Sequence, residues 1–136
     1  DGVSTSPAAV PVVAQAPPPS SPFANVVTWT HAAHPTPVLI HQDGRVSVLA
    51  APSTFLGLSA DTRRQAHSVP LCAGDTLVLF TDGLVERRDA PMQDGLTALQ
   101  DALTELATHP VEQLCDALRR RMLPLRAADD VALLVV

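Results

Sequence analysis

Residues 74–86 read GDTLVLFTDGLVE, and this stretch decides how the rest of the chain is interpreted. A Gly-Asp turn precedes the apolar run TLVLF, which is typical of a buried strand. That strand delivers Thr81, Asp82 and Gly83 at its C-terminal edge. A charged side chain beside an apolar strand is costly to leave there unless something binds it, so Asp82 is a candidate ligand.

A second apolar run with carboxylates at one edge closes the sequence. Residues 129–136 read DDVALLVV, and the unbroken run VALLVV predicts a strand in the middle of a covered sheet. If the two strands are neighbours, the carboxylates of Asp82 and Asp129 converge. Asp130 is the reserve candidate, because successive side chains of a strand point to opposite faces. Converged carboxylates repel unless a cation lies between them or one takes up a proton.

These carboxylates permit two interpretations. Hard divalent cations such as Mg²⁺ and Mn²⁺ prefer carboxylate and water oxygens, which makes Asp82 and Asp129 predicted metal ligands. Asp-Gly is equally ordinary turn chemistry, and Asp-Asp before a strand can simply cap a loop. The residues alone leave both interpretations open.

The rest of the chain predicts an α+β layered fold. Residues 26–31 and 37–42 are β-branched, partly alternating runs, and an Asp-Gly pair at 43–44 signals a hairpin. Leucines over 96–106 recur at helical spacing, as do apolar residues over 111–122, where Pro110 suits the first turn. Strands, two helices and a final strand form the expected order of elements.

Composition limits the classes of function. A chain of 136 residues suits one domain, with a core of Val, Leu and Ala because aromatic residues are only 3%. The net charge of −5, with nine arginines and no lysine, lacks the basic surface that nucleic-acid binding requires. No apolar run approaches the ~20 residues of a membrane-spanning helix. Cys72 and Cys115 are interpreted as buried, reduced residues, which predicts a cytoplasmic protein.

The first part of the sequence differs from the rest. Residues 1–22 contain six of the thirteen prolines and almost no charge, which favours extended, solvated backbone. We therefore expect residues 1–24 to be a linker or disordered arm, and residues 25–136 to form the folded part.

Three segments, taken in order, resemble a known family. They are WTHAAHPTPVLI at 29–40, GDTLVLFTDGLVE at 74–86 and DDVALLVV at 129–136. Together they resemble the C-terminal half of the SpoIIE-type (RsbU-like) branch of the metal-dependent Ser/Thr protein phosphatases, the type 2C or PPM family. The likeness runs from about Asn25 to Val136. Where that family usually has Ala-Gly-His-Pro, this sequence has Ala33 in place of the glycine.

The resemblance implies a fold and a chemistry. It implies a partial αββα sandwich, in which antiparallel sheets carry flanking helices and a dinuclear Mn²⁺ or Mg²⁺ centre lies between the sheets. Metal-held water attacks phosphoserine or phosphothreonine, so no side chain takes a covalent part. In that family, the aspartate of the TDG motif and the first aspartate of the DD motif are metal ligands. The matching residues in this sequence are Asp82 and Asp129.

The resemblance also implies a biological setting. Members of this branch typically act on phosphorylated anti-sigma-factor antagonists, in the partner switching that regulates sigma factors. In that family, the first half of the phosphatase domain supplies further metal-binding motifs, of the Gly-Gly-Asp and Asp-Val-Ser-Gly-His-Gly kind. These motifs are absent from this sequence. The sequence therefore predicts an incomplete phosphatase domain with weak metal binding, and leaves the enzymatic activity of this chain open.

Two other interpretations remain, together with a possible dimer. One is a non-catalytic truncated module or pseudophosphatase that binds proteins, and the other is a small α+β interaction domain whose aspartates only cap turns. Exposed sheet edges would invite pairing between copies. Among the remaining polar residues, His34 is interpreted as structural and Glu86 as a solvated loop charge. Arg119, Arg120 and Arg121 are interpreted as a solvated helix end.

Overall fold

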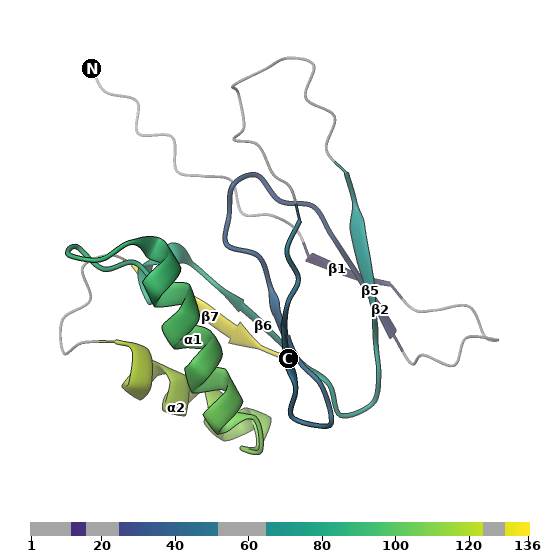
Figure 1. Cartoon of the computed structure of the whole chain (residues 1–136). Coiled ribbons are helices and arrows are strands. Elements are labelled where there is room, and N and C mark those ends of the chain that lie inside the picture. The colour runs from purple at the N-terminus through teal and green to yellow at the C-terminus, as the bar shows by residue number, and fades with distance from the viewer. Residues whose placement is uncertain (1–11, 16–24, 52–64, 124–129) are drawn as a thin grey trace, which may run out of the picture. The chain divides into compact units, whose positions relative to one another are not determined.

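The computed structural model describes residues 12–15, 25–51, 65–123 and 130–136. The chain forms two compact units, one of residues 1–33 and 53–71 and the other of residues 34–52 and 72–136. Each unit contains one antiparallel sheet, and both helices belong to the second unit (Figure 1). The observed α+β class, with antiparallel sheets and two helices, agrees with the predicted one.

The first unit is a three-stranded sheet in the order β1-β2-β5. Its strands are β1 (Val12–Gln15), β2 (Asn25–Trp29) and β5 (His67–Leu71). The central strand β2 lies in the predicted β-branched run, whereas β5 was not predicted. The hydroxyl groups of Thr28 and Ser68 are 2.9 Å apart across the β2–β5 pair, which adds a cross-strand hydrogen bond to the backbone ladder.

Strand β1 lies within residues 1–24. The proline-rich composition predicted a linker or disordered arm, but Val12–Gln15 pairs antiparallel with β2. This four-residue segment contains no proline, so every backbone N–H in it can join a ladder. The rest of residues 1–24 lies outside the described part of the chain, and the boundary near residue 25 stays a prediction.

The second unit is a four-stranded antiparallel sheet in the order β4-β3-β6-β7. Its strands are β3 (Val38–Ile40), β4 (Val46–Val48), β6 (Thr76–Phe80) and β7 (Leu133–Val135). The predicted hairpin joins β3 to β4, and Gly44 has the positive φ of 84° that its turn requires. Asp43 accepts a hydrogen bond from the Arg45 backbone N–H, which lowers the pKa of its carboxyl group.

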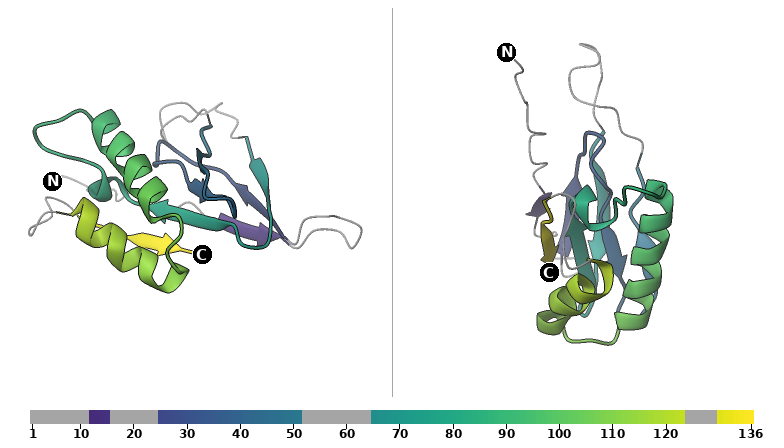
Figure 2. Two further views of the ribbon diagram at one scale, coloured as in Figure 1. Left: turned by 60° about the horizontal axis from the view of Figure 1, so that its bottom comes forward. Right: turned by 90° about the vertical axis from the view of Figure 1, so that its left-hand side faces the viewer.

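Both predicted helices are present. Helix α1 spans Met92–Leu106 and helix α2 spans Val111–Met122, and each begins directly after a proline with extended ψ. They pack against each other along one face of the sheet, with α1 contacting β4 and α2 contacting β7 (Figures 1 and 2). An ion pair of 2.8 Å between Arg121 and Glu105 joins their exposed sides. Among the described residues, no helix is long and apolar enough to cross a bilayer.

The core of the second unit lies between the sheet and the two helices. Alternate residues of β6, Val78 and Phe80, face this core, as the period of two in a strand requires. Among the described residues, Phe80 is the one aromatic side chain in this core, in keeping with the aromatic-poor composition. Its buried members are Val38, Ile40, Val78, Phe80, Leu84, Val85, Leu99, Ala102, Leu103, Leu114, Leu118 and Met122.

Strand β7 differs from its prediction in one respect. The run VALLVV was expected in the middle of a covered sheet, but among the described residues β7 pairs with β6 alone and forms the edge. Leu134 and Val136 are 58% and 67% exposed. An apolar run indicates that both faces of a strand are apolar, and it carries no information on whether another strand pairs with its outer edge.

Helix α1 approaches the loop before it very closely at Gly95. A Cβ atom at this position would lie 1.8 Å from the carbonyl oxygen of Val85, and both residues are buried. Ordinary helix propensity favours alanine over glycine by about 1 kcal/mol, so a glycine here is explained by space and not by propensity.

We predict that Gly95→Ala destabilises the protein by about 2 kcal/mol, because a clash with backbone cannot be relieved by a side-chain movement. Urea unfolding measures the change. Thr97→Ala, at an exposed position of the same helix, is the matched control and should leave stability within about 0.5 kcal/mol of the parent or raise it. A stabilised Gly95→Ala variant would contradict the close approach.

The loop after β2 contains a strained residue. Ala33 has φ 58°, and it is the one non-glycine residue with positive φ in the described part of the chain. At this position the family that the sequence resembles usually has glycine. The left-handed conformation costs an L-residue roughly 1–2 kcal/mol, which glycine avoids.

Ala33→Gly should therefore raise the free energy of unfolding by about 0.5–1 kcal/mol, since relief of strain exceeds the added entropy of the unfolded chain. Ala32→Gly provides the control, because Ala32 lacks a positive φ and its substitution should lower stability by about 0.4–1 kcal/mol. Thermal unfolding of both variants measures the two changes in stability. Equal losses of stability in the two variants would show that Ala33 is unstrained.

Candidate functional site

The two strands that carry the predicted ligands are neighbours. Strand β6 pairs antiparallel with β7, and Phe80 lies opposite Leu133 at the last pair of the ladder. The C-terminal end of β6 therefore meets the N-terminal end of β7 at one edge of the sheet. The convergence of carboxylates predicted from the sequence depended on this pairing.

Thr81 extends the pairing beyond the strands and joins the two segments. Its backbone N–H donates to the carbonyl of Ala132 at 3.0 Å, and its side-chain oxygen accepts from the Ala132 N–H at 2.9 Å. The same hydroxyl group donates to the carbonyl of Asp130 at 3.3 Å. One residue thus fixes the start of the TDG turn against the backbone of residues 130–132.

Asp82 begins a single 3-10 turn, Asp82–Leu84. Its carbonyl accepts hydrogen bonds from the N–H groups of Val85 and Glu86 at 2.8 and 2.7 Å. Its carboxylate oxygen Oδ1 accepts from the Gly83 N–H at 2.9 Å, which restricts the side chain. Gly83, Leu84 and Val85 are buried while Asp82 is exposed, so the carboxylate stands at the surface on a rigid, buried base.

The TDG turn consists of residues 81–83, and the DD segment consists of residues 129–131. Gly83 brings the TDG turn into contact with Asp130 and Val131 of the DD segment. A Cβ atom at Gly83 would lie 2.4 Å from the carbonyl oxygen of Asp130 and 3.3 Å from a methyl group of Val131. Any side chain here would push the two segments apart. Glycine is therefore required by packing, in addition to its ordinary place in an Asp-Gly turn.

The predicted ligand pair, Asp82 and Asp129, stays a prediction, because Asp129 lies outside the described residues. Asp130, the reserve candidate, is described: it is exposed, and its carbonyl faces Thr81 and Gly83. The backbone contact places the turn that carries Asp82 beside Asp130 at one edge of the sheet.

The donor atoms at this edge suit a hard cation in kind but are few in number. Carboxylate oxygens are the protein ligands that Mg²⁺ and Mn²⁺ prefer, and Mg²⁺ takes about six oxygens in all. Within the described ranges, no group of three or more His, Cys, Asp or Glu residues could hold a metal ion. Further ligands would have to come from residues beyond those described, or from water.

The other polar residues singled out from the sequence lie apart from this edge or form ordinary contacts. His34 Nδ1 lies 3.0 Å from the carbonyl of Pro35, which fits its structural interpretation. Glu86 is exposed, as expected of a solvated loop charge. Arg119 lies 3.8 Å from Asp116 in an exposed pair, in keeping with a solvated helix end.

The cysteines are free, but one prediction about them was wrong. Cys72 is exposed and Cys115 is half-buried, whereas both were expected to be buried. The reason for Cys72 is its place after β5, in the turn that leads to β6. There its backbone N–H donates to the Asp75 carboxylate at 2.9 Å.

Comparison with protein families identifies the chain. A family model described as Stage II sporulation protein E (SpoIIE) matches residues 21–136. The chain belongs to the SpoIIE family. The match includes the TDG turn, the DD segment and the loop that contains Ala33.

Solved structures show the same fold in related phosphatase domains. The RsbU and RsbW domains of a Mycobacterium tuberculosis protein superpose with a TM-score of 0.70 at 28% identity, covering 81% of this chain and 31% of that one. The phosphatase domain of the cell fate determinant SpoIIE from Bacillus subtilis, presoaked with Mn, gives 0.68 at 16% identity and covers 94% and 55%. The PP2C domain of SiaA from Pseudomonas aeruginosa gives 0.58 at 22% identity and covers 81% and 45%.

These coverages show that the chain spans only part of the SpoIIE-type structures it matches, between 31% and 55% of the three compared. The sequence patterns indicated the two acidic segments but not the contact of Gly95 with Val85 or the hydrogen bond from Arg87 to the Met122 carbonyl, which join the loop after Asp82 to the two helices. Local patterns carry no signal for such contacts.

Substitution of Thr81 tests the junction between the two segments. Thr81→Val removes the hydroxyl group that bonds Ala132 and Asp130, and should lower the free energy of unfolding by about 1 kcal/mol or more. Thr81→Ser keeps the hydroxyl group and should retain most of the stability. Equal losses in the two variants, measured by urea unfolding, would show that the methyl group matters and the hydrogen bonds do not.

Proposed function

We propose that this chain is the C-terminal part of a metal-dependent phosphoserine and phosphothreonine protein phosphatase, in which Asp82 and Asp129 hold Mn²⁺ or Mg²⁺. One observation above all supports the proposal: the TDG turn lies against the DD segment through the contact of Gly83 with the Asp130 backbone. The membership in the SpoIIE family supports the same reaction class.

The chain's own residues would bind and orient the ions and would not react. Asp82 presents its carboxylate from a turn whose backbone is buried, so a cation would meet a ligand that has already lost most of its conformational freedom. Divalent ions in such a centre activate a water molecule and offset charge on the phosphoryl oxygens. Asp130 is the alternative second ligand if Asp129 faces away.

The remaining ligands would come from the part of the domain that precedes these residues in related proteins. Two carboxylates with water form a weak site for a small hard cation. We therefore expect residues 1–136 by themselves to bind Mn²⁺ weakly and to hydrolyse little para-nitrophenyl phosphate. Chelator-sensitive turnover by this chain would contradict that expectation.

The substrate class is proposed from the setting of the relatives. One neighbour contains RsbU and RsbW domains in a single structure, which supports a place in partner switching. The proposed substrate is a phosphorylated anti-sigma-factor antagonist, and the proposed location is the cytoplasm. A non-catalytic binding module is the second candidate, because the described residues contain no group of three metal-ligating side chains.

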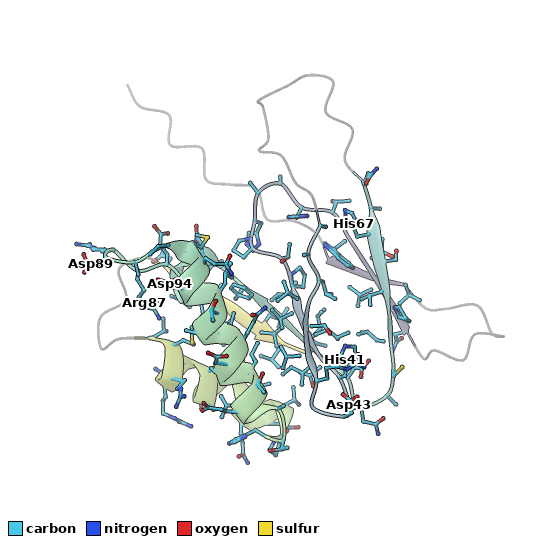
Figure 3. The ribbon with its side chains drawn as sticks, in the orientation of Figure 1. His41, Asp43, His67, Arg87, Asp89 and Asp94 are labelled. Carbon is cyan, nitrogen blue, oxygen red and sulfur yellow. The ribbon has the colours of Figure 1, made fainter. Side chains whose placement is uncertain are left out.

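Asp82→Asn should reduce the rate of Mn²⁺-dependent dephosphorylation by the full-length protein at least about 100-fold. Substitution of residues that only support metal ligands already lowers metal affinity or activity about 10–100-fold. The measurement is release of phosphate from a phosphoserine protein across a Mn²⁺ titration. Asp89→Asn is the control: Asp89 is an exposed aspartate seven positions along the same loop, and its substitution should leave the rate unchanged (Figure 3).

Two results would contradict the proposal. Full activity in Asp82→Asn would remove Asp82 from the metal site and favour the interpretation that it only caps a turn. Absence of Mn²⁺-dependent activity in the parent protein, together with binding of the unphosphorylated antagonist, would favour the non-catalytic module.

A further inference from the structure

The hairpin of β3 and β4 brings an imidazole and a serine hydroxyl group together. His41 directly follows β3, and Ser47 is the middle residue of β4. Nε2 of the His41 ring lies 2.9 Å from Oγ of Ser47. We propose that Ser47 is a reactive serine, whose hydroxyl group is activated by His41 as a general base toward acyl electrophiles such as activated esters.

This pair is separate from the candidate metal site. Ile40 pairs with Thr76, the first residue of β6, whereas Asp82 follows the last residue of the same strand. The hairpin therefore lies at the opposite end of β6 from the TDG turn. The reactivity proposed for Ser47 does not depend on the proposed phosphatase function.

The two side chains have the geometry that proton transfer needs. A general base must lie within about 2.6–3.2 Å of the atom whose proton it takes, and the distance between His41 and Ser47 falls in that range. In the tautomer that carries its proton on Nδ1, the imidazole accepts a hydrogen bond from the hydroxyl group through Nε2. Both residues are half-buried, so a small reagent can reach a hydroxyl group that is partly shielded from water.

The hairpin holds both groups in place. Ser47 lies opposite Leu39 in the ladder, and Leu39 is buried. Residues 39 and 41 point to the same face because side chains alternate along a strand, so the imidazole reaches the hydroxyl group along the diagonal. The His41 backbone N–H donates to the carbonyl of Arg45, and the His41 carbonyl accepts from the N–H of Gly44, each at 2.8 Å. The imidazole is therefore attached to backbone that is bonded in both directions.

A carboxylate in the same hairpin interacts with the charge of the imidazole (Figure 3). The hydrogen bond from the Arg45 N–H lowers the pKa of the Asp43 carboxyl group, and the positive charges of Arg45 and His41 add to this effect. The same attraction stabilises the imidazolium that forms when His41 takes a proton. Arg45 lies 3.6 Å from the Asp43 carboxylate in an exposed pair and shares that negative charge.

The proposed reaction is transfer of an acyl group to Ser47. Oγ of Ser47 forms a bond to the carbonyl carbon of the ester, and the bond from that carbon to the leaving oxygen breaks. The hydroxyl proton passes to Nε2 of His41, and the leaving group departs as an anion. The product is an ester of Ser47, and the reaction needs no oxidant, reductant or cofactor.

The test is acetylation of the full-length protein by para-nitrophenyl acetate, followed over time by peptide mass spectrometry. Ser47 should be acetylated about 100-fold faster than Ser68, in line with the contribution of a positioned general base. Ser68 is a matched internal control, because it is exposed and its hydroxyl group lies 2.9 Å from that of Thr28. The comparison uses the parent protein alone, so it does not depend on the folding of any variant.

His41→Gln separates proton transfer from structure. The glutamine amide can still form a hydrogen bond with Ser47 but cannot serve as a base, so acetylation of Ser47 should slow about 100-fold. Urea unfolding of the same variant should show little change in stability. His109→Gln replaces an exposed histidine after α1 and should leave the acetylation rate of Ser47 unchanged.

Two results would overturn the proposal. Equal acetylation rates at Ser47 and Ser68 would show that the contact with His41 is an ordinary cross-strand hydrogen bond. Rapid acetylation of Ser47 that persists in a folded His41→Gln variant would show that His41 does not act as the base.

Discussion

The close approach of Gly83 to the Asp130 backbone is the contact on which the candidate site depends. It allows the TDG turn to lie against the segment that precedes β7, so two acidic segments far apart in the sequence meet at one sheet edge. A second close approach, of Gly95 to Val85, holds the same loop against helix α1. Together these contacts give Asp82 an exposed carboxylate on a backbone that is packed on two sides, which is the arrangement that preorganised ligand binding requires.

Much of the fold was predictable because its elements have strong local patterns. The helices over 92–106 and 111–122 follow from apolar spacing, and the hairpin at 43–44 follows from an Asp-Gly pair between β-branched runs. Strand β5 was missed because HSVPL contains a proline and polar residues that only pairing with β2 makes strand-like. The edge position of β7 was missed for a related reason, since strand order is a property of the whole sheet and not of one segment.

Some residues of the candidate site can likewise be recognised from local sequence, whereas others are revealed only by contacts between distant parts of the chain. Asp82 was singled out because a carboxylate that directly follows TLVLF is unusual. The pairing of β6 with β7 was a condition of the predicted convergence, and only the structure supplies it. Arg87 was not identifiable, because its partner at the end of α2 lies 35 positions away and an arginine in a loop is ordinarily solvated. Membership in the SpoIIE family supports the proposed reaction class, and the contact of Gly83 with the Asp130 backbone supports the proposed site.

The central claim is that a divalent ion lies between the TDG turn and the DD segment. The most direct measurement is the position of the anomalous scattering peak of Mn²⁺ in crystals of the full-length protein grown with that ion. We predict a peak about 2.1 Å from a carboxylate oxygen of Asp82 and at a similar distance from one of Asp129 or Asp130. A peak elsewhere in the molecule, with Asp82 bonded only to its own turn, would contradict the account.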